Sequence, residues 1–389
     1  MRNNNPAIVV VAYNRPKSLT RLLKSIQNAY YPNKEVTLGI SIDFSTVNNY
    51  VFEIAENFEW NYGEKKVIRH SEILGLKKHI ISCGDLSQEY GSVIILEDDL
   101  YLSPNFFNYT ISALNFSQDK DYIGGVALYN HKINVHKGEY FMALDDGFDN
   151  WYFQFACSWG QAWNATQWKR FKTWLSDNPT LVKATAIPEN VSNWSDKSWL
   201  KFFIAYLINS NTYFLYPKVS LSTNFNDPGT HVGQDSTAYQ VELLYDQKET
   251  YHFSTLDRSE AVYDAFFESQ IVAKSLGYQN DMLEIDLYGY KPVNEKRFWL
   301  TAKRLQKKQL YAYTRSLKPI ESNIIQQLHG NELLLYDMTV DEKNNFIKQG
   351  YADYRRIIYS AKVLSYKRAT LVLKKLVSDR ILKFLGKTN

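Results

Sequence analysis

The sequence lacks the features that mark several large classes of protein. It contains two cysteines, Cys83 and Cys157, which are too few for a disulfide framework and form no Cys-x-x-Cys or Cys/His cluster for zinc. No run approaches the roughly 20 apolar residues needed to cross a bilayer, and the apolar stretch near the N-terminus is too short for a signal peptide. We therefore expect a protein of a reducing compartment, the cytoplasm.

Two glycine-rich phosphate-binding motifs are also missing. No Gly-x-Gly-x-x-Gly follows the first apolar run, and no Gly-x-x-x-x-Gly-Lys-Ser/Thr occurs anywhere. These absences argue against a dinucleotide-binding domain and against a P-loop.

An excess of basic over acidic charge occurs only in the C-terminal tail. The formal net charge of the chain is +4, yet residues 350–389 carry ten Lys or Arg against two Asp, so the remainder is acidic on balance. This distribution argues against a nucleic-acid-binding surface over the body. The tail predicts a basic helix with interleaved apolar residues, which could associate with an anionic membrane at its cytoplasmic face.

Apolar runs and helical patterns alternate over the first hundred residues. Strands that alternate with helices predict an α/β fold with an open, mostly parallel sheet covered by helices on both faces. In such sheets, ligands bind beyond the carboxyl ends of the strands. The expected strands are residues 7–12, 36–43, 65–70 and 92–99, and the expected helices are residues 19–26, 50–60 and 74–90.

An acidic triplet ends the fourth of these runs, in "VIILEDDLYLSPNFF" (93–107). The carboxylates of Glu97, Asp98 and Asp99 repel one another unless water or a cation separates them. Either the triplet is a solvated turn, or it serves a divalent cation such as Mg²⁺ or Mn²⁺, which binds one or two carboxylates together with phosphate oxygens.

The later sequence is less regular. An aromatic stretch at 144–175 contains Trp159 and Trp163, for which core packing is favoured over the alternative of stacking on a sugar. A Gly-, Pro- and Asn-rich stretch at 216–235 predicts a long loop over a site. Residues 280–350 predict one strand (282–290) among charged helical stretches.

Three segments resemble those of the GT-A glycosyltransferases. In chain order they are "AIVVVAYNRP", "SIDFS" and "VIILEDDLYLSPNFFNY". Within that group the sequence is most similar to the inverting N-acetylglucosaminyltransferase I type, whose version of the DxD motif is also Glu-Asp-Asp followed by a leucine and a Pro-x-Phe-Phe stretch. The resemblance covers roughly residues 6–240 and fades afterwards.

The resemblance implies roles for the acidic residues. It implies that Asp99 ligates Mn²⁺ or Mg²⁺, that Asp98 faces the ribose and that Glu97 lies near the donor sugar. Asp43, at the end of the second expected strand, is similar to the aspartate that contacts uracil.

Further donor contacts follow from the same resemblance. Ala12, Tyr13 and Arg15 correspond to the loop that holds the nucleotide, and the guanidinium of Arg15 could also pair with a diphosphate. The alternative for Arg15 is a surface residue at a helix cap. Lys78 could neutralise a phosphate or be a solvated helical lysine, and His231 could touch the phosphates or be an ordinary loop histidine.

Inversion at an anomeric carbon requires a base that accepts the proton of the attacking hydroxyl. The resemblance implies a carboxylate in a tryptophan-rich stretch, and Asp196 in "NVSNWSDKSW" is the best match. Its alternative is a helix cap, with Ser195 or Asp196 beginning the next helix. The competing candidates for the base are Asp145, Asp146, Asp149 and Asp227.

Together these observations predict a metal-dependent inverting glycosyltransferase. It would transfer a sugar, GlcNAc or a related hexose, from a UDP-sugar to a glycan or lipid-linked glycan acceptor in bacterial surface or capsular polysaccharide synthesis. The alternatives are a nucleotidyltransferase and a non-catalytic carbohydrate-binding protein. The expected parts are a nucleotide-sugar half (1–130) and an acceptor half (131–240) of one glycosyltransferase domain, a C-terminal extension (241–349) and a basic helical tail (350–389).

Overall fold

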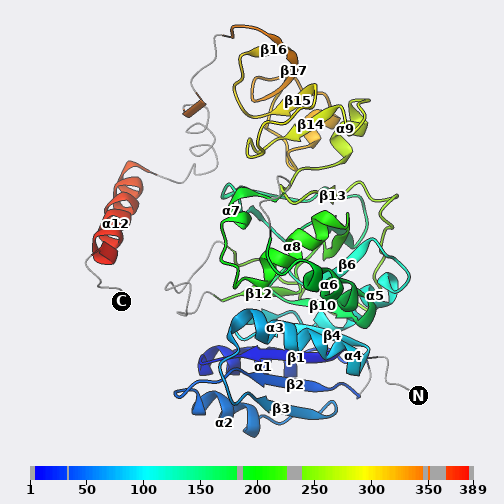
Figure 1. Ribbon diagram of the computed structural model, residues 1–389, viewed down its shortest axis with the longest axis vertical. Helices are drawn as coiled ribbons and strands as arrows, with labels where there is room; N and C mark the ends of the chain where they lie inside the picture. Colours follow the sequence, from blue (N-terminus) through cyan, green and yellow to red (C-terminus); the bar gives the residue numbers. More distant parts are fainter. Residues whose placement is uncertain are drawn as a thin grey trace.

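The computed structural model describes residues 5–32, 35–181, 187–225, 239–344, 349–350 and 365–384. Figure 1 shows a large sheet with its helices, a smaller group of strands at the upper end and the helix α12, which stands apart from both. The large sheet has nine strands in the order β13-β9-β11-β6-β10-β4-β1-β2-β3.

The nine strands pair mostly in parallel. Only β10 with its two neighbours and β9 with β11 are antiparallel. The strands are β1 (Ala7–Ala12), β2 (Leu38–Ile42), β3 (Lys65–Arg69), β4 (Ser92–Glu97), β6 (Ile123–Ala127), β9 (Asn150–Phe153), β10 (Gln161–Asn164), β11 (Tyr213–Pro217) and β13 (Val262–Tyr263).

Helices cover both faces of this sheet, as the continuous apolar run of β1 requires. Alternate β1 side chains face opposite ways, so Val9 packs into the core on one side and Val10 into the core on the other. The helices are α1 (Pro16–Gln27), α2 (Asn49–Asn57), α3 (Gly75–Asp85), α4 (Ser87–Tyr90), α5 (Phe106–Ser117), α6 (Ala165–Asp177), α7 (Glu189–Ser192), α8 (Trp199–Asn209), α9 (Ile271–Ser275), α10 (Ser322–Ile325) and α12 (Tyr366–Phe384).

The alternation predicted for the first hundred residues is confirmed. All four expected strands are present as β1 to β4, with helices between them. Leu19, Leu22, Leu23 and Ile26 are buried on one side of α1, as their spacing predicts. The helix expected at 74–90 is divided into α3 and α4.

The prediction of charged helical stretches at 280–350 is wrong for most of that range. A four-stranded sheet in the order β14-β15-β17-β16 forms there. Its strands are β14 (Leu283–Asp286), β15 (Phe298–Thr301), β16 (Lys307–Tyr313) and β17 (Leu333–Asp341). Because β16 is an edge strand, its polar residues Lys308 and Gln309 are exposed while Ala312 and Tyr313 face the core.

Two short ribbons complete the described strands. One pairs β5 (Leu100–Leu102) with β12 (Ser222–Asn224), and the other pairs β7 (Ile133–Asn134) with β8 (Glu139–Tyr140). The large sheet also runs past residue 240, where the sequence analysis divided the chain, because β13 pairs with β9.

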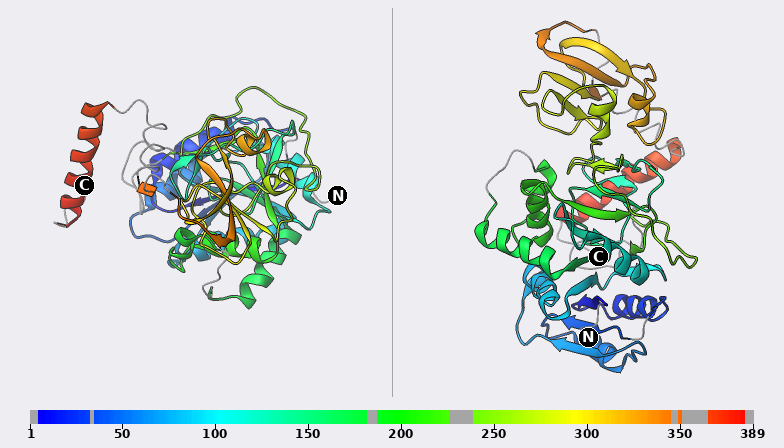
Figure 2. Two further views of the ribbon diagram at one scale, coloured as in Figure 1. Left: turned by 90° about the horizontal axis from the view of Figure 1, so that it is seen from above. Right: turned by 90° about the vertical axis from the view of Figure 1, so that its right-hand side faces the viewer.

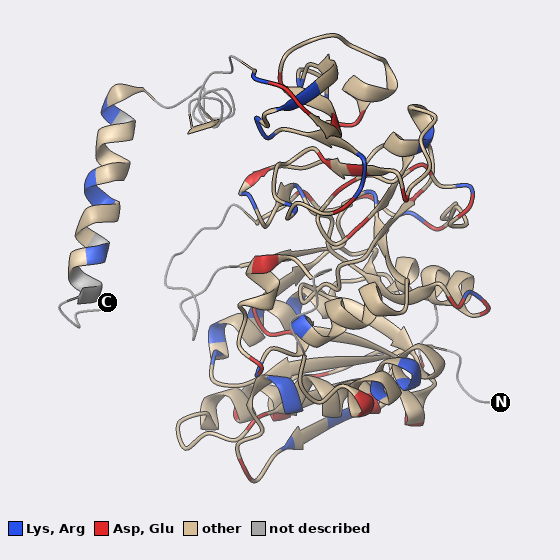
Figure 3. Ribbon diagram, turned by 45° about the horizontal axis from the view of Figure 1, so that its top comes forward, with Lys and Arg blue, Asp and Glu red and all other residues tan. Residues whose placement is uncertain are grey.

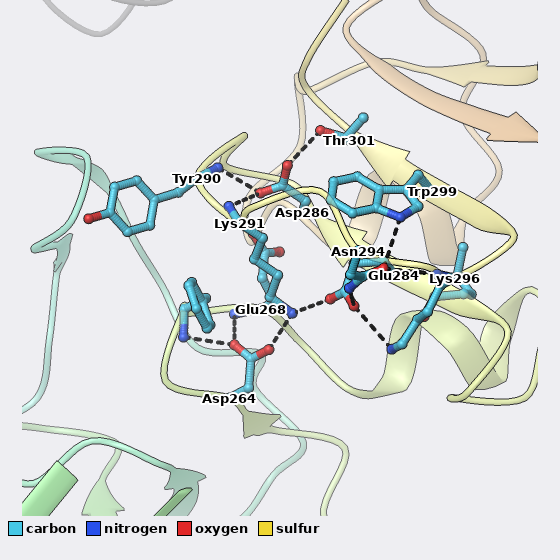
Figure 4. Close-up of polar contacts among 12 residues, drawn as sticks. Asp264, Glu268, Glu284, Asp286, Tyr290, Lys291, Asn294, Lys296, Trp299 and Thr301 are labelled. Atoms are coloured by element: carbon cyan, nitrogen blue, oxygen red, sulfur yellow. Dashed lines mark hydrogen bonds and ion pairs between the residues drawn. The ribbon is translucent and has the colours of Figure 1, made fainter. Parts of the chain in front are cut away.

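A polar network joins the large sheet to the small one (Figure 4). Lys291 Nζ lies 2.6 Å from Asp264 Oδ2, directly after β13, and 2.6 Å from Glu284 Oε1 in β14. Burial acts against the charge of Lys291, but these carboxylates outweigh it and raise its pKa. Glu284 also binds Lys296 and Asn294, so the Glu284 carboxylate is paired on both of its oxygens.

Candidate active site

The carboxyl ends of β1, β2 and β4 meet at one edge of the large sheet. The strands are parallel neighbours, with Val11 opposite Glu97 and Ala12 opposite Ile42. The backbone N–H of Asp43 donates to the carbonyl of Ala12 at 3.0 Å. This arrangement brings the predicted donor residues of three separate segments together at the edge where such sheets bind ligands.

The acidic triplet occupies the turn between β4 and β5. Glu97 ends β4, and Glu97 Oε1 and Asp98 Oδ2 are buried without a hydrogen-bond partner. Burial, together with the charges of Asp99 and Asp98, raises the pKa of Glu97 to about 8. Burial also raises the pKa of Asp98 to about 6, against the opposing effect of Arg15. The turn therefore carries buried acceptor groups that have no hydrogen-bond partner among the described residues.

Arg15 supplies the positive charge at this turn. It is the N-cap residue of α1, and its side chain contacts the Asp98 carboxylate and lies 3.0 Å from Asp99 Oδ2. Burial lowers the pKa of the guanidinium, but the two carboxylates outweigh it and raise the pKa overall. Arg15 is thus at a helix cap, as one interpretation held, and is also the counter-ion of the acidic turn.

Asp43 holds the start of α3 against the end of β2. Its Oδ1 accepts the backbone N–H groups of Phe44 and Leu74 at 2.9 and 2.8 Å, and its Oδ2 accepts that of Gly75 at 2.9 Å. Gly75 has a φ of 71°, a backbone conformation that glycine adopts without strain. The buried Asp43 carboxylate therefore has a structural role, and Oδ2 retains a lone pair that can accept a further donor.

A divalent cation at the acidic turn would have few protein ligands. Among the described residues, no group of three or more His, Cys, Asp or Glu side chains could hold a metal. Asp99 keeps 18% of its side chain exposed and Asp98 only 3%, so Asp99 is the carboxylate that a cation can reach. One accessible carboxylate suits Mg²⁺ or Mn²⁺ that arrives with a diphosphate and keeps several waters.

Asp196 lies beside the first turn of α3. Lys77 Nζ donates to the carbonyl of Asp196 at 3.0 Å, and Lys77 is two residues beyond Gly75, which Asp43 binds. The Asp196 carboxylate is 74% exposed and pairs with Lys201 at 2.8 Å. The hydrogen bond from Lys201, followed by its charge, lowers the pKa of Asp196. Asp196 is therefore an ionised, solvent-accessible carboxylate connected to the donor edge through α3.

The helix-cap interpretation of Asp196 is wrong. The N-cap of α8 is Ser198, whose side chain accepts the backbone N–H of Lys201. Ser195 and Asp196 precede the cap, so neither carboxylate nor hydroxyl there is needed to begin α8.

The competing carboxylates are held by other contacts. Asp149 Oδ1 lies 2.5 Å from Lys248 Nζ, and its Oδ2 accepts the His252 N–H at 2.8 Å. Asp146 Oδ2 accepts from Ser259 and Glu260, and Asp145 accepts a nearby backbone N–H. Asp146 and Asp149 therefore anchor the 248–260 segment. Asp227 lies outside the described residues.

The remaining predicted residues divide between exposed, buried and undescribed positions. Tyr13 and Lys78 are exposed, the latter on α3. Trp163 is fully buried and packs on Trp168 and Phe203, so it is a core residue. Trp159 is partly buried beside Tyr129 and Tyr239. His231 lies outside the described residues.

Sequence reasoning missed two polar residues at this edge. Asn48 donates to the carbonyls of Tyr13 at 3.1 Å and Asp43 at 2.8 Å, which ties two strand ends together. Gln161 of β10 is fully buried opposite Ile95 of β4, and neither its amide oxygen nor its nitrogen has a partner. The available signal for Gln161 was a polar residue within the apolar pattern of "SWGQAW".

The part of the chain that contains the acidic turn matches a known protein family. Residues 7–171 match the model of Glycosyl transferase family 2, a region that includes β1, the acidic turn and α3. The chain therefore carries a glycosyltransferase domain, which confirms the predicted enzyme class and the α/β GT-A fold class. The narrower N-acetylglucosaminyltransferase I type remains a prediction. No curated protein sequence matches the chain.

Two solved structures show a partial likeness. One is the mannosyltransferase PcManGT from Pyrobaculum calidifontis in complex with GDP-Man and Mn²⁺, with 12% identity over 44% of this chain and 47% of that one and a TM-score of 0.30. The other is S. aureus TarS 1–349 in complex with UDP-GlcNAc, with 16% identity over 58% of this chain and 60% of that one and a TM-score of 0.37. The matched region thus spans less than two thirds of either structure.

The raised pKa of Glu97 predicts a pH-dependent effect of Glu97→Gln on stability. Between about pH 4.5 and pH 8 the native state holds a proton on Glu97 that the unfolded state releases, so this group makes wild type less stable as pH rises. Glutamine does not titrate. Between pH 5 and pH 8 the free energy of unfolding of the variant, measured in urea, should therefore rise by on the order of 4 kcal/mol relative to that of wild type. Glu89→Gln, at an exposed position, is the control. If the stability difference from wild type does not depend on pH for either variant, the raised pKa of Glu97 is contradicted.

Proposed function

We propose that this protein is a metal-dependent inverting glycosyltransferase that uses a UDP-sugar. The observation that carries the proposal is the acidic turn after β4, which lies at the ligand-binding edge of a sheet within the family 2 domain match. Its buried, unpartnered carboxylate oxygens suit a ligand that brings both a cation and hydroxyl donors. The nucleotidyltransferase and carbohydrate-binding alternatives gain no support from these contacts.

In this proposal, the donor nucleotide lies across the ends of β1, β2 and β4. The buried Asp43 carboxylate accepts the uracil ring N–H, and Ala12 and Tyr13 form the floor of the nucleotide site. Asp98 is assigned to the ribose on the resemblance, and its carboxylate would have to become accessible when the donor binds. Glu97 is assigned to the donor sugar on the resemblance. Lys78 and His231 are assigned to the phosphates on the resemblance alone.

Asp99 is the residue proposed to hold Mn²⁺ or Mg²⁺. When bound, such an ion offsets the negative charge that builds on the departing diphosphate. Arg15 is the cationic side chain that already lies at the turn, where it contacts the carboxylates of Asp98 and Asp99. A guanidinium binds phosphate as readily as carboxylate, so Arg15 can turn to the diphosphate once Asp99 has another counter-charge.

Asp196 is the proposed base. The hydroxyl of the acceptor attacks the anomeric carbon from the face opposite the diphosphate, the bond between carbon and diphosphate oxygen breaks, and the hydroxyl proton passes to a carboxylate. Asp196 is an exposed carboxylate that an acceptor can reach, and its carboxylate form is the one that accepts a proton. We propose GlcNAc or a related hexose as the transferred sugar and a surface or capsular polysaccharide glycan as the acceptor.

Replacement of Asp99 should abolish activity, because the activity depends on the metal ion that Asp99 is proposed to hold. We expect Asp99→Asn to lower transfer from, or hydrolysis of, a UDP-sugar at least 100-fold because the cation loses its accessible carboxylate. Chelation should abolish wild-type activity, and added Mn²⁺ should restore it. Asp121→Asn is the matched control, because the Asp121 side chain is 98% exposed and forms an ion pair with Arg170. Full activity of Asp99→Asn, or of the chelated wild type, would refute the metal assignment.

Replacement of Asp196 should separate binding from turnover. Asp196→Asn keeps the shape of the side chain but cannot accept the proton, so kcat should fall by about 10² to 10⁴ while UDP affinity is unchanged. The Asp121→Asn variant again serves as control, since it also neutralises an exposed, ion-paired carboxylate. Unchanged turnover in Asp196→Asn would transfer the base role to Asp149 or Asp227.

A further inference from the structure

α12 combines a high positive charge with exposed apolar side chains. Between Tyr366 and Phe384 the sequence has six Lys or Arg and one Asp. Its exposed apolar residues, 48% to 88% accessible, are Tyr366, Leu371, Val372, Leu373, Leu376, Val377 and Ile381. Two perpendicular views show the helix standing away from the rest of the protein (Figures 1 and 2).

The apolar residues of α12 are not confined to one narrow stripe. Leu373, Val377 and Ile381 recur at every fourth position and line a shallow groove along the helix with Lys374 and Ser378. Leu371 and Val372 point to other sides, because successive residues are about 100° apart around a helix. Lys and Arg recur between these residues along the coloured part of the helix (Figure 3).

We propose that α12 docks this protein on the surface of an anionic lipid bilayer. A wide apolar arc with interspersed basic residues suits a lipid interface, where long basic side chains extend to the headgroups while the apolar ones enter the acyl boundary. Among the described residues, none of the helices combines the length and apolar content needed to cross a membrane. α12 would therefore lie in the plane of the interface.

Charge and the arrangement of apolar residues favour a lipid bilayer over a second copy of α12 or a groove on another protein. A second copy of α12 would bring two helices of the same high positive charge together, which disfavours self-association. A groove on a protein partner would cover one stripe and leave Leu371 and Val372 in water. Residues 1–349 are acidic on balance, so an anionic bilayer attracts the tail and repels the body. Attachment would thus be through the tail alone, on a cytoplasmic leaflet rich in anionic lipid.

Membrane docking goes beyond the transfer reaction and has a separate test. If the proposed function also holds, docking brings the enzyme to lipid-linked glycan acceptors, and only this consequence rests on that function. Vesicle binding needs no active enzyme, so failure of either proposal can be recognised without the other.

The test is flotation of the full chain with vesicles of phosphatidylcholine alone or with about 30% phosphatidylserine. We expect at least tenfold greater partition to the anionic vesicles, lost in high salt. Lys374→Glu with Lys375→Glu, and separately Leu373→Gln with Val377→Gln, should each lower this partition at least tenfold. Lys137→Glu with Lys274→Glu makes the same charge change at exposed body positions and should bind as wild type does.

Three outcomes would overturn the docking proposal. The first is equal partition of wild type to neutral and anionic vesicles, or none to either. The second is wild-type binding by the Lys374/Lys375 variant. The third is that wild type binds no vesicles but sediments as a dimer, and that the Leu373/Val377 variant is a monomer. This result would show that α12 binds a second copy of the chain. Circular dichroism and UDP-sugar hydrolysis of each variant verify that the fold is intact.

Discussion

Three adjacent carboxylates at the end of a buried strand require a positive charge, and much of the site can be understood from this constraint. Arg15 supplies this charge: its side chain extends from the N-cap of α1 and contacts Asp98 and Asp99. Burial leaves Glu97 and Asp98 with raised pKa values and with oxygens that lack partners. Such a turn is poorly stabilised by the protein alone and well suited to a ligand that brings its own cation.

Helix α3 links this edge of the sheet to the segment that contains the proposed base. Asp43 binds the first backbone N–H groups of α3, and two residues later Lys77 binds the carbonyl of Asp196. Hydrogen bonds through the first turn of α3 therefore connect the proposed uracil contact with the backbone of the residue proposed as the base.

The features that could be predicted were those that depend on local patterns in the sequence. The buried run of β1, the spacing of Leu19 to Ile26 and the polar residues after each strand fixed the α/β class and the candidate edge in advance. The contact of Arg15 with the acidic turn joins residues 84 positions apart, and no local pattern reports it. The strand β16 was taken for helix because its exposed Lys and Gln residues hide the alternation of an edge strand. Trp163 could not be assigned to the core until its neighbours were known.

The central claim is that the acidic turn forms a cation-dependent site for a nucleoside diphosphate. Calorimetric titration of UDP into the protein, with Mn²⁺ and with a chelator, measures this directly and requires neither the acceptor nor the correct sugar. The account predicts binding in the presence of Mn²⁺ that weakens at least tenfold when the metal is removed. Equal affinity under both conditions, or no binding under either, would contradict it.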